Sequence, residues 1–286
     1  MMKISTGERL EFYDFSEVTV EHLHRYAIAN DFVSGKVVLD IASGEGYGSY
    51  ILSEKALEVI GVDIDVETIE NSIKKYSKNN LKFFVGSADN IPVESNSIDV
   101  VVSFETIEHH DKHEEMLLEI KRVLKHDGIL IMSSPDKKYY SDLAGQKNPF
   151  HVKELYFQDF KALVDQFFQF TNYYCQNSFN LNSFIGSFES IDKFKIYTGD
   201  ENSINDNSIL PVYNVVIASE INGFGVDDSF FNGIQIAKRI ENRCEKKIKS
   251  DLVLEWKRSN TYKIGHLIIF PFYIIKKKLK RFFNDF

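Results

Sequence analysis

Alternating glycines next to an acidic residue form the part of this sequence with the clearest chemical potential. Gly44, Gly46 and Gly48 follow an apolar run that begins at Val37 and contains Asp40. Glycine lets the backbone adopt angles that other residues avoid and approach a bound ligand closely. The first turn of a following helix would then offer free amide groups and a positive dipole end to a negative group. Taken alone, the run also fits a tight strand-to-helix turn without a ligand.

Two further acidic residues favour a bound ligand. Asp63 ends a second apolar run about twenty residues beyond the loop, where a carboxylate can accept hydrogen bonds from both hydroxyls of a ribose. Asp89 follows a third apolar run, and a carboxylate there suits the amino group of an adenine. A dinucleotide would need room for a pyrophosphate, whereas S-adenosylmethionine (SAM) ends in an amino acid and a sulfonium. The acid after the third run therefore favours SAM.

The elements that must position these residues alternate along residues 37–135. Apolar runs typical of buried parallel strands are separated by helix-like segments without interruption. This alternation predicts a parallel sheet with helices on both faces. Because such sheets bind ligands at the carboxyl ends of their strands, we expect Gly44, Asp63, Asp89 and the segment after Val102 to gather at one edge.

The order of these motifs resembles that of class I SAM-dependent methyltransferases, among them the bacterial sugar methyltransferases associated with polysaccharide and O-antigen synthesis. The resemblance covers roughly residues 5–220. It implies an α/β fold: a Rossmann-like, doubly wound sheet of about seven strands, with an antiparallel last hairpin and helices on both faces. The helical spacing of the tail adds the expectation of a helical C-terminal extension, which lies outside the resemblance. It also implies SAM as the cofactor. The cofactor-binding residues that it implies are Arg25, Asp40, Ala42, Gly44, Gly46, Asp63, Ile64, Ala88, Asp89 and Glu105.

Two histidines are predicted to act in the chemical step that the resemblance implies. Methyl transfer is an in-line displacement, so holding the acceptor and the methyl group in line supplies much of its acceleration. A hydroxyl acceptor also gains from a base that removes its proton, and histidine suits that role near neutral pH. His109, after the fourth strand, is the predicted base, and His151, beyond the fifth, is the second choice. Each also fits a structural role at the start of a helix.

Two segments are expected to surround the site. Residues 1–36 would form an N-terminal lid from which Arg25 or Tyr26 reaches the SAM carboxylate, or a helix that only packs on the sheet. Residues 180–208 are polar and aromatic, and we interpret them as an insertion over the site that shapes acceptor choice, or as a disordered loop. No carboxylate cluster in this insertion resembles a magnesium site, so we expect methyl transfer without a metal.

Length and composition fit one large domain with an appendage. The chain has 286 residues, of which 43% are hydrophobic. Cys175 and Cys244 show neither metal-ligand spacing nor a disulfide framework, which suits a reducing compartment. The N-terminus lacks an apolar secretion core, so we expect a cytoplasmic protein. We divide the chain into a methyltransferase domain at residues 1–220 and a basic helical tail at residues 221–286.

Charge is distributed unevenly between these two expected domains. The net charge is −8, but the tail carries +7 and the remainder −15. An acidic body would repel the phosphates of nucleic acid, so we expect no nucleic-acid partner. Within the tail, the mostly apolar residues 264–275 are too few to span a bilayer, which takes about twenty. The lysine-rich segment that follows suits an anionic membrane surface, although a C-terminal helix buried against the core also fits.

These features leave three functions in competition. Tails of this kind resemble those of bacterial enzymes that build lipid-linked polysaccharides. The first expectation is therefore O-methylation of a sugar in a surface polysaccharide or its precursor, with the protein bound peripherally to the inner membrane. The second is a quinone or another lipid-like small-molecule acceptor, and the third is a non-catalytic scaffold in a glycan assembly complex. Residues 234–256 have helical spacing and would dock on the body or on a second subunit of an oligomer.

Overall fold

The computed structural model describes residues 17–145, 147–191, 193–259 and 262. The chain divides into two compact units, Met1–Ile234 and Gln235–Phe286. Residues 1–16 of the expected lid and residues 264–283, which contain the expected membrane-binding end of the tail, lie outside the described residues.

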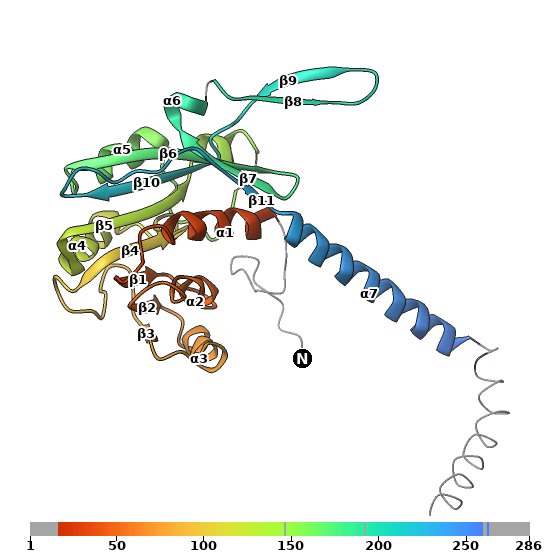
Figure 1. The fold of residues 1–286 in the computed structure, drawn as a ribbon, viewed down its shortest axis with the longest axis horizontal. Coiled ribbons are helices and arrows are strands. Elements are labelled where there is room, and N and C mark those ends of the chain that lie inside the picture. Colours follow the sequence, from red (N-terminus) through yellow and green to blue (C-terminus); the bar gives the residue numbers. More distant parts are fainter. Residues whose placement is uncertain (1–16, 146, 192, 260–261, 263–286) are drawn as a thin grey trace, which may run out of the picture. The chain divides into compact units, whose positions relative to one another are not determined.

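The first unit is built on one large mixed sheet (Figure 1). Its parallel part contains, in spatial order, β3 (Leu81–Val85), β2 (Glu58–Asp63), β1 (Val37–Ile41), β4 (Ile98–Phe104) and β5 (Leu124–Pro135). β10 (Tyr213–Ser219) pairs antiparallel with β5, and β6 (Phe170–Phe179) pairs antiparallel with β10. These seven strands correspond to those that the sequence analysis predicts.

Two further strands extend the sheet beyond the prediction. β7 (Asn182–Ser187) pairs with β6, and β11 (Ser229–Asn232) pairs with β7, so this sheet has nine strands among the described residues. The expected number of about seven is therefore too low. Both added strands are short and lack a clear alternation of apolar residues, the pattern that reveals a strand in a sequence. Because β11 belongs to the sheet, the first unit continues to Ile234, past the boundary expected at residue 220.

Two apolar cores cover the two faces of the sheet. Helices α1 (Glu17–Ala29), α2 (Tyr47–Leu52) and α3 (Val66–Lys75) contribute to one core, and α4 (His113–Val123) and α5 (Phe157–Val164) contribute to the other. Along β5, Ile129 and Ile131 belong to the first core, whereas Leu130 and Met132 belong to the second. Successive side chains of a strand point to opposite faces, so a strand buried on both faces is apolar at every position.

The segment expected as an insertion has secondary structure of its own. After β7 it contains the short helix α6 (Phe188–Ile191) and a separate antiparallel hairpin of β8 (Lys195–Gly199) and β9 (Ile204–Ser208). Every residue of β9 is exposed. The alternative of a disordered loop is therefore wrong for the described residues of this segment.

The second unit is described chiefly through α7 (Ile234–Arg258), a helix of 25 residues that begins at the end of the first unit. Apolar residues such as Ile248, Leu252 and Trp256 are exposed along it together with its charged residues. No helix within the described ranges is both long and apolar enough to cross a membrane.

Candidate functional site

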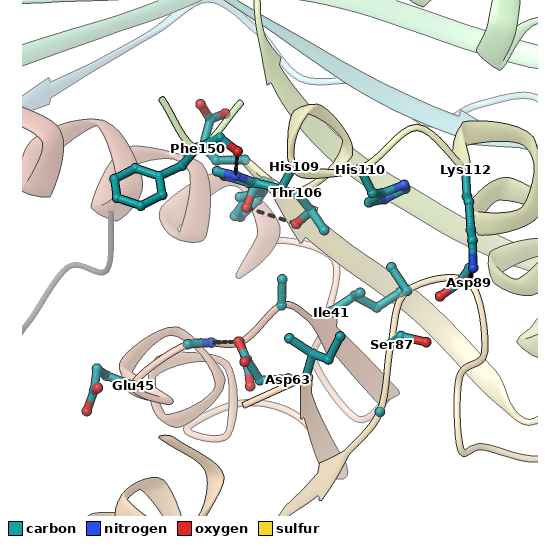
Figure 2. Close-up of a pocket in the computed structure, with 18 of the residues that line it drawn as sticks. Ile41, Glu45, Asp63, Ser87, Asp89, Thr106, His109, His110, Lys112 and Phe150 are labelled. Atoms are coloured by element: carbon teal, nitrogen blue, oxygen red, sulfur yellow. Dashed lines mark hydrogen bonds and ion pairs between the residues drawn. The ribbon is translucent and has the colours of Figure 1, made fainter. Parts of the chain in front are cut away.

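A cavity of about 610 Å³ opens at the carboxyl ends of the parallel strands (Figure 2). Its wall comes from the segments that follow β1, β2, β3 and β4, together with α1. A volume of this size is typical of cofactor and small-molecule sites. The predicted site residues that line it are Ala42, Gly44, Asp63, Ile64, Ala88, Asp89, Glu105 and His109. The others, Arg25, Asp40, Gly46 and His151, do not line it.

The glycine loop between β1 and α2 has one open and one closely packed position. Gly44 (φ +52°) has open space where a Cβ would lie, and its backbone N–H donates to Asp63 Oδ2 at 2.9 Å. Gly46 (φ +74°) precedes α2, and a Cβ there would lie 2.8 Å from the Phe83 ring and 2.9 Å from Ser72 Oγ. Gly44 therefore faces the cavity. Gly46, which was expected to bind the cofactor, instead allows close packing against β3 and α3.

Asp40 is buried beneath this loop rather than exposed in the cavity wall. Its carboxylate accepts hydrogen bonds from Ser49 Oγ at 2.6 Å and from the Tyr26 hydroxyl at 3.3 Å. Burial raises the pKa of Asp40 to about 7, although these two hydrogen bonds act in the opposite direction. Asp40 thus connects α1 and α2 to β1, and it is Tyr26 that lines the cavity. Asp40 therefore supports the loop, and the direct cofactor contact expected of it stays a prediction.

Asp63 ends β2 and is held in the cavity wall by backbone hydrogen bonds. Oδ2 accepts from Gly44, and Oδ1 accepts from the N–H of Asp65 at 2.9 Å. The next residue, Ile64, is 71% exposed and adds an apolar surface to the same part of the wall.

Asp89 is paired with a lysine that the sequence analysis did not identify. Lys112 Nζ lies 2.5 Å from Asp89 Oδ2, and both residues line the cavity (Figure 2). Hydrogen bonds from Lys112 and Ser87 lower the pKa of Asp89 to about 2. The Asp89 carboxylate is therefore ionised at neutral pH, with one oxygen already engaged by a cation.

Arg25 lies behind the cavity wall and supports Glu105. Arg25 is 1% exposed, and its Nη1 lies 3.1 Å from Glu105 Oε1. Its Nε donates to Gln176 Oε1 at 2.5 Å, and its guanidinium group lies 4.5 Å from the centre of the Tyr213 ring. Ser133 Oγ also donates to Glu105 Oε1, at 2.6 Å. Arg25 was expected to reach the cofactor itself; in this structure Glu105 lines the cavity and Arg25 does not.

Two residues of the wall have an unfavourable backbone conformation. Ala42 (φ +55°) and Glu105 (φ +51°) directly follow β1 and β4, which are neighbours in the sheet. Such left-handed conformations cost non-glycine residues about 1–3 kcal/mol each and concentrate at functional sites. Their occurrence on adjacent strand ends marks this edge of the sheet as the functional one.

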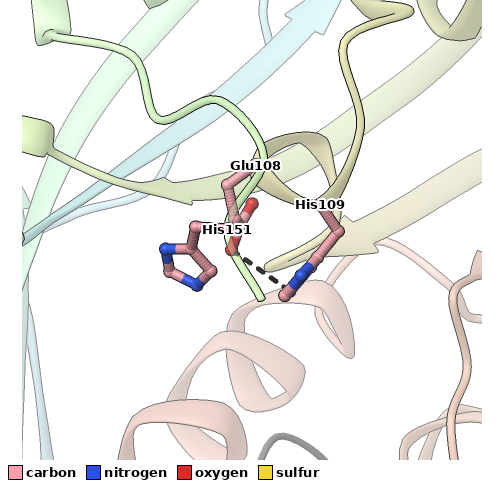
Figure 3. Close-up of side chains that lie close together, drawn as sticks. All are labelled: Glu108, His109 and His151. Atoms are coloured by element: carbon pink, nitrogen blue, oxygen red, sulfur yellow. Dashed lines mark ion pairs between the residues drawn. The ribbon is translucent and has the colours of Figure 1, made fainter. Parts of the chain in front are cut away.

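Glu108, His109 and His151 converge beside the cavity (Figure 3). His109 ends the short 3₁₀ turn η1 (Ile107–His109), and its Nδ1 lies 3.2 Å from the carbonyl oxygen of Phe150. His151 Nδ1 lies 2.6 Å from Glu154 Oε1, and the centroids of the two imidazole rings are 5.1 Å apart. The structure therefore brings both predicted bases together, although only His109 lines the cavity.

Glu108 is the buried member of this group. Its side chain is 1% exposed, and neither carboxylate oxygen has a hydrogen-bond partner within the described part of the chain. Oε1 lies 4.0 Å from His109 Nε2. Burial, together with the charge of Glu105, raises the pKa of Glu108 well above its usual range.

The wall of the cavity is acidic. Its acidic residues are Glu45, Asp63, Asp89, Glu105 and Asp111. Among the described residues of the lining, Lys112 is the only lysine or arginine. His22 also lines the cavity, but burial and the charge of Arg25 lower its pKa to about 3, so it is neutral. A wall of this sign favours a ligand with a cationic group.

The segments expected to surround the site contribute unequally. From the lid, α1 supplies His22 and Tyr26 to the wall, whereas no described residue of the segment 180–208 lines the cavity. The expectation that this segment covers the site is therefore wrong for this cavity. Phe150, near His151, is a wall residue that sequence reasoning missed, and its place in a loop of no regular pattern gave no signal.

Comparison with known proteins identifies related sequences and folds. Residues 39–132 match the family described as a methyltransferase domain. A "Probable S-adenosylmethionine-dependent methyltransferase" from Mycolicibacterium smegmatis is 32% identical over 46% of this chain and 51% of its own length. A protein of the same description from Mycobacterium tuberculosis is 31% identical over 56% of this chain and 58% of its own length. A more distant relative, a fatty-acid O-methyltransferase from Mycolicibacterium smegmatis, is 25% identical over 42% of this chain and 47% of its own length.

The alignments span about half the length of these relatives. Among solved structures, the YcgJ protein from Bacillus subtilis has a TM-score of 0.51 at 20% identity, covering 70% of this chain and all of that protein. This likeness shows a Rossmann-like α/β methyltransferase fold with a mostly parallel sheet. Residues 39–132 thus match a methyltransferase domain, and the two relatives above 30% identity are described as probable S-adenosylmethionine-dependent methyltransferases.

Proposed function

We propose that this chain transfers the methyl group of SAM to an oxygen of a small acceptor. The observation that carries the proposal is the meeting of Gly44, Asp63 and Asp89 in the wall of one cavity at the carboxyl edge of the sheet. The matched residues 39–132 contain these three positions, so the family similarity and the cavity concern the same part of the chain.

The wall suits the chemistry of SAM. Asp63 offers oxygens to the ribose hydroxyls, and the exposed Ile64 offers an apolar surface to the adenine ring. The open position at Gly44 leaves room for the amino acid end. SAM supplies a methyl group that is activated by the positive charge of its sulfonium. The excess of carboxylates in the wall complements that charge.

His109 is the residue proposed to take the acceptor proton. A carbonyl oxygen can only accept, so the contact with Phe150 assigns the imidazole proton to Nδ1 and leaves the lone pair on Nε2. As the acceptor oxygen bonds to the methyl carbon, its hydroxyl proton passes to Nε2 of His109. His151 is the second choice because it does not line the cavity.

The acceptor class is the finer part of this proposal. The basic, aromatic end of the tail sequence supports a sugar of a membrane-bound precursor as the first candidate. An acceptor with an apolar body is the second candidate, supported by the fatty-acid O-methyltransferase among the relatives and by Phe104 and Phe150 in the wall. A non-catalytic scaffold is disfavoured because Asp63, Asp89 and Glu105 are each held in place by specific partners.

Two measurements test the proposal. Titration calorimetry of the full chain with S-adenosylhomocysteine (SAH) should show one binding site, and absence of binding at millimolar SAH would refute the cofactor assignment. Transfer of labelled methyl groups is then measured with lipid-linked glycan extracts, fatty acids and quinones as separate acceptors. Label in the glycan supports the sugar, label in an apolar acceptor supports the second candidate, and SAH binding without any transfer supports a scaffold.

The base is tested by His109→Ala. Removal of a general base costs about 10²–10⁴ in rate, so turnover should fall at least a hundredfold while SAH still binds. His126→Ala is the matched control, because His126 is exposed and does not line the cavity. Near-normal turnover of the His109 variant would move the role to His151 or to positioning alone.

A further inference from the structure

We propose that Glu108, His109 and His151 bind one divalent transition-metal cation of the zinc type at the edge of the cofactor cavity. The ligand atoms that these side chains offer all lie within 4.8 Å of one another (Figure 3). Two imidazole nitrogens and one carboxylate oxygen are a ligand set that proteins use for Zn²⁺ and related cations. Tetrahedral ligands of Zn²⁺ are about 3.3 Å apart, so ligand atoms within 4.8 Å of one another need to approach by up to about 1.5 Å around the ion.

The carboxylate of Glu108 independently points to a cation. It is almost fully buried and has no hydrogen-bond partner among the residues that the structure describes. A buried carboxylate is unfavourable unless a partner compensates for its lost hydration. Its Oε1 faces His109 Nε2 at 4.0 Å, too far for a hydrogen bond but suitable for two ligands on either side of an ion. A cation at this point would supply the missing partner of Glu108.

The contacts behind the two imidazoles orient them for metal binding. The Phe150 carbonyl accepts from His109 Nδ1, and the Glu154 carboxylate accepts from His151 Nδ1. Each contact assigns the proton to Nδ1 and the lone pair to Nε2. His151 Nε2 accepts from Asn148 Nδ2 at 2.9 Å, a contact that the cation would replace. A carboxylate or carbonyl group behind a histidine is the usual support of a metal-binding imidazole.

The position of the site gives the cation a role in the proposed reaction, and this step rests on the proposed function. His109 lines the cavity, so a cation bound to it would lie at the edge of the cavity, within reach of an acceptor held there. A hydroxyl bound to such a cation loses its proton to water more readily. Its oxygen then bonds to the methyl carbon as the carbon–sulfur bond of SAM breaks, and neutral SAH leaves. With the cation bound, His109 is a ligand and water takes the proton in its place.

Metal binding by the full chain tests the site without any assay of activity. After treatment with a chelator and its removal, the protein is titrated with Zn²⁺ in a calorimeter, and with Co²⁺ while visible absorption is recorded. Mg²⁺ serves as the comparison cation because it prefers oxygen ligands. The variants are Glu108→Gln, His151→Ala and Glu154→Gln, with His126→Ala as the control for non-specific binding by an exposed histidine. SAH titration of each variant checks its fold, since Glu108, His151 and Glu154 do not line the cavity.

The wild type and the His126 variant should bind one Zn²⁺ and give the Co²⁺ spectrum of a site with nitrogen ligands. Glu108→Gln and His151→Ala should weaken Zn²⁺ binding at least a hundredfold, and Glu154→Gln about 10- to 100-fold, with unchanged SAH affinity. Equal Zn²⁺ affinity in the wild type and the two ligand variants would overturn the site. SAH binding without Zn²⁺ binding would overturn it while leaving the proposed function intact. Zn²⁺ binding without SAH binding would support the metal site and overturn the proposed function.

Discussion

Asp63→Asn changes one atom of the cavity wall and should separate ligand binding from stability. In the wild type both carboxylate oxygens accept a backbone N–H, from Gly44 and from Asp65, each at 2.9 Å. The amide nitrogen of asparagine cannot accept, so one of these N–H groups would face another donor. The ribose of SAM would also lose one hydrogen bond to a charged oxygen. Hydrogen bonds to charged groups contribute about 1.5–3 kcal/mol, which corresponds to a 10- to 150-fold increase in the Kd of SAH.

The matched control is Asp99→Asn. Asp99 also accepts a backbone N–H, from Val37 at 2.8 Å, and pairs with Lys125 at 2.9 Å, but it does not line the cavity. Urea unfolding should show a similar loss of stability in the two variants, on the order of 1–3 kcal/mol. Titration calorimetry should show weakened SAH binding in the Asp63 variant alone. An Asp63 variant that is folded and binds SAH within threefold of the wild type would refute the assignment of Asp63 to the ribose.

Three further predictions concern burial, charge and the tail. Burial raises the folded-state pKa of Asp40 from 3.8 to about 7, so its favourable contribution to stability is complete below about pH 4 and is lost as the pH rises through 7. Asp40→Asn should therefore gain stability relative to the wild type by up to ~4 kcal/mol between pH 4 and 8. A difference in unfolding free energy between variant and wild type that stays constant over this pH range in urea unfolding would contradict this. Arg25→Met leaves Glu105 without its buried partner and should cost about 3–5 kcal/mol in urea unfolding, and a loss below about 1 kcal/mol would show that the ion pair is dispensable. In flotation with anionic liposomes, a chain ending at residue 258 should bind more weakly than the full chain, and equal binding would remove the proposed membrane role of the tail.

The part of the site that the sequence predicts is the part built from strand ends. Gly44, Asp63 and Asp89 each follow an apolar run directly, and parallel pairing brings the ends of such runs to one edge. Their meeting in one cavity therefore needs no information beyond local pattern and topology. The same reasoning predicts the two buried faces of the sheet, since both faces of β5 are apolar in the sequence.

The part that the sequence could not predict depends on contacts between distant segments. Lys112 reaches Asp89 from another loop, and His151 reaches Glu108 and His109 from the loop after β5. Neither relation follows a helical or strand period, so spacing gives no signal for it. The expectation of methyl transfer without a metal rests on the carboxylates of residues 180–208, whereas the cluster of two imidazoles and one buried carboxylate lies in two other loops. The short strands β7 and β11 are not predicted for a similar reason, because each is identified by its pairing with a neighbouring strand and not by a residue pattern of its own.

The way each acid of the wall is held determines how it can act on a bound cation. Asp89 and Glu105 are paired with Lys112 and Arg25, which cancel much of their charge, whereas Asp63 is held by backbone N–H groups that carry partial charge. Fixed dipoles orient a carboxylate and leave most of its field available to a ligand. In a methyl transfer the sulfonium of SAM becomes the neutral sulfur of SAH, so this attraction is present for the donor and absent for the product. An acidic wall of this kind therefore favours binding of the donor and release of the product at the same site.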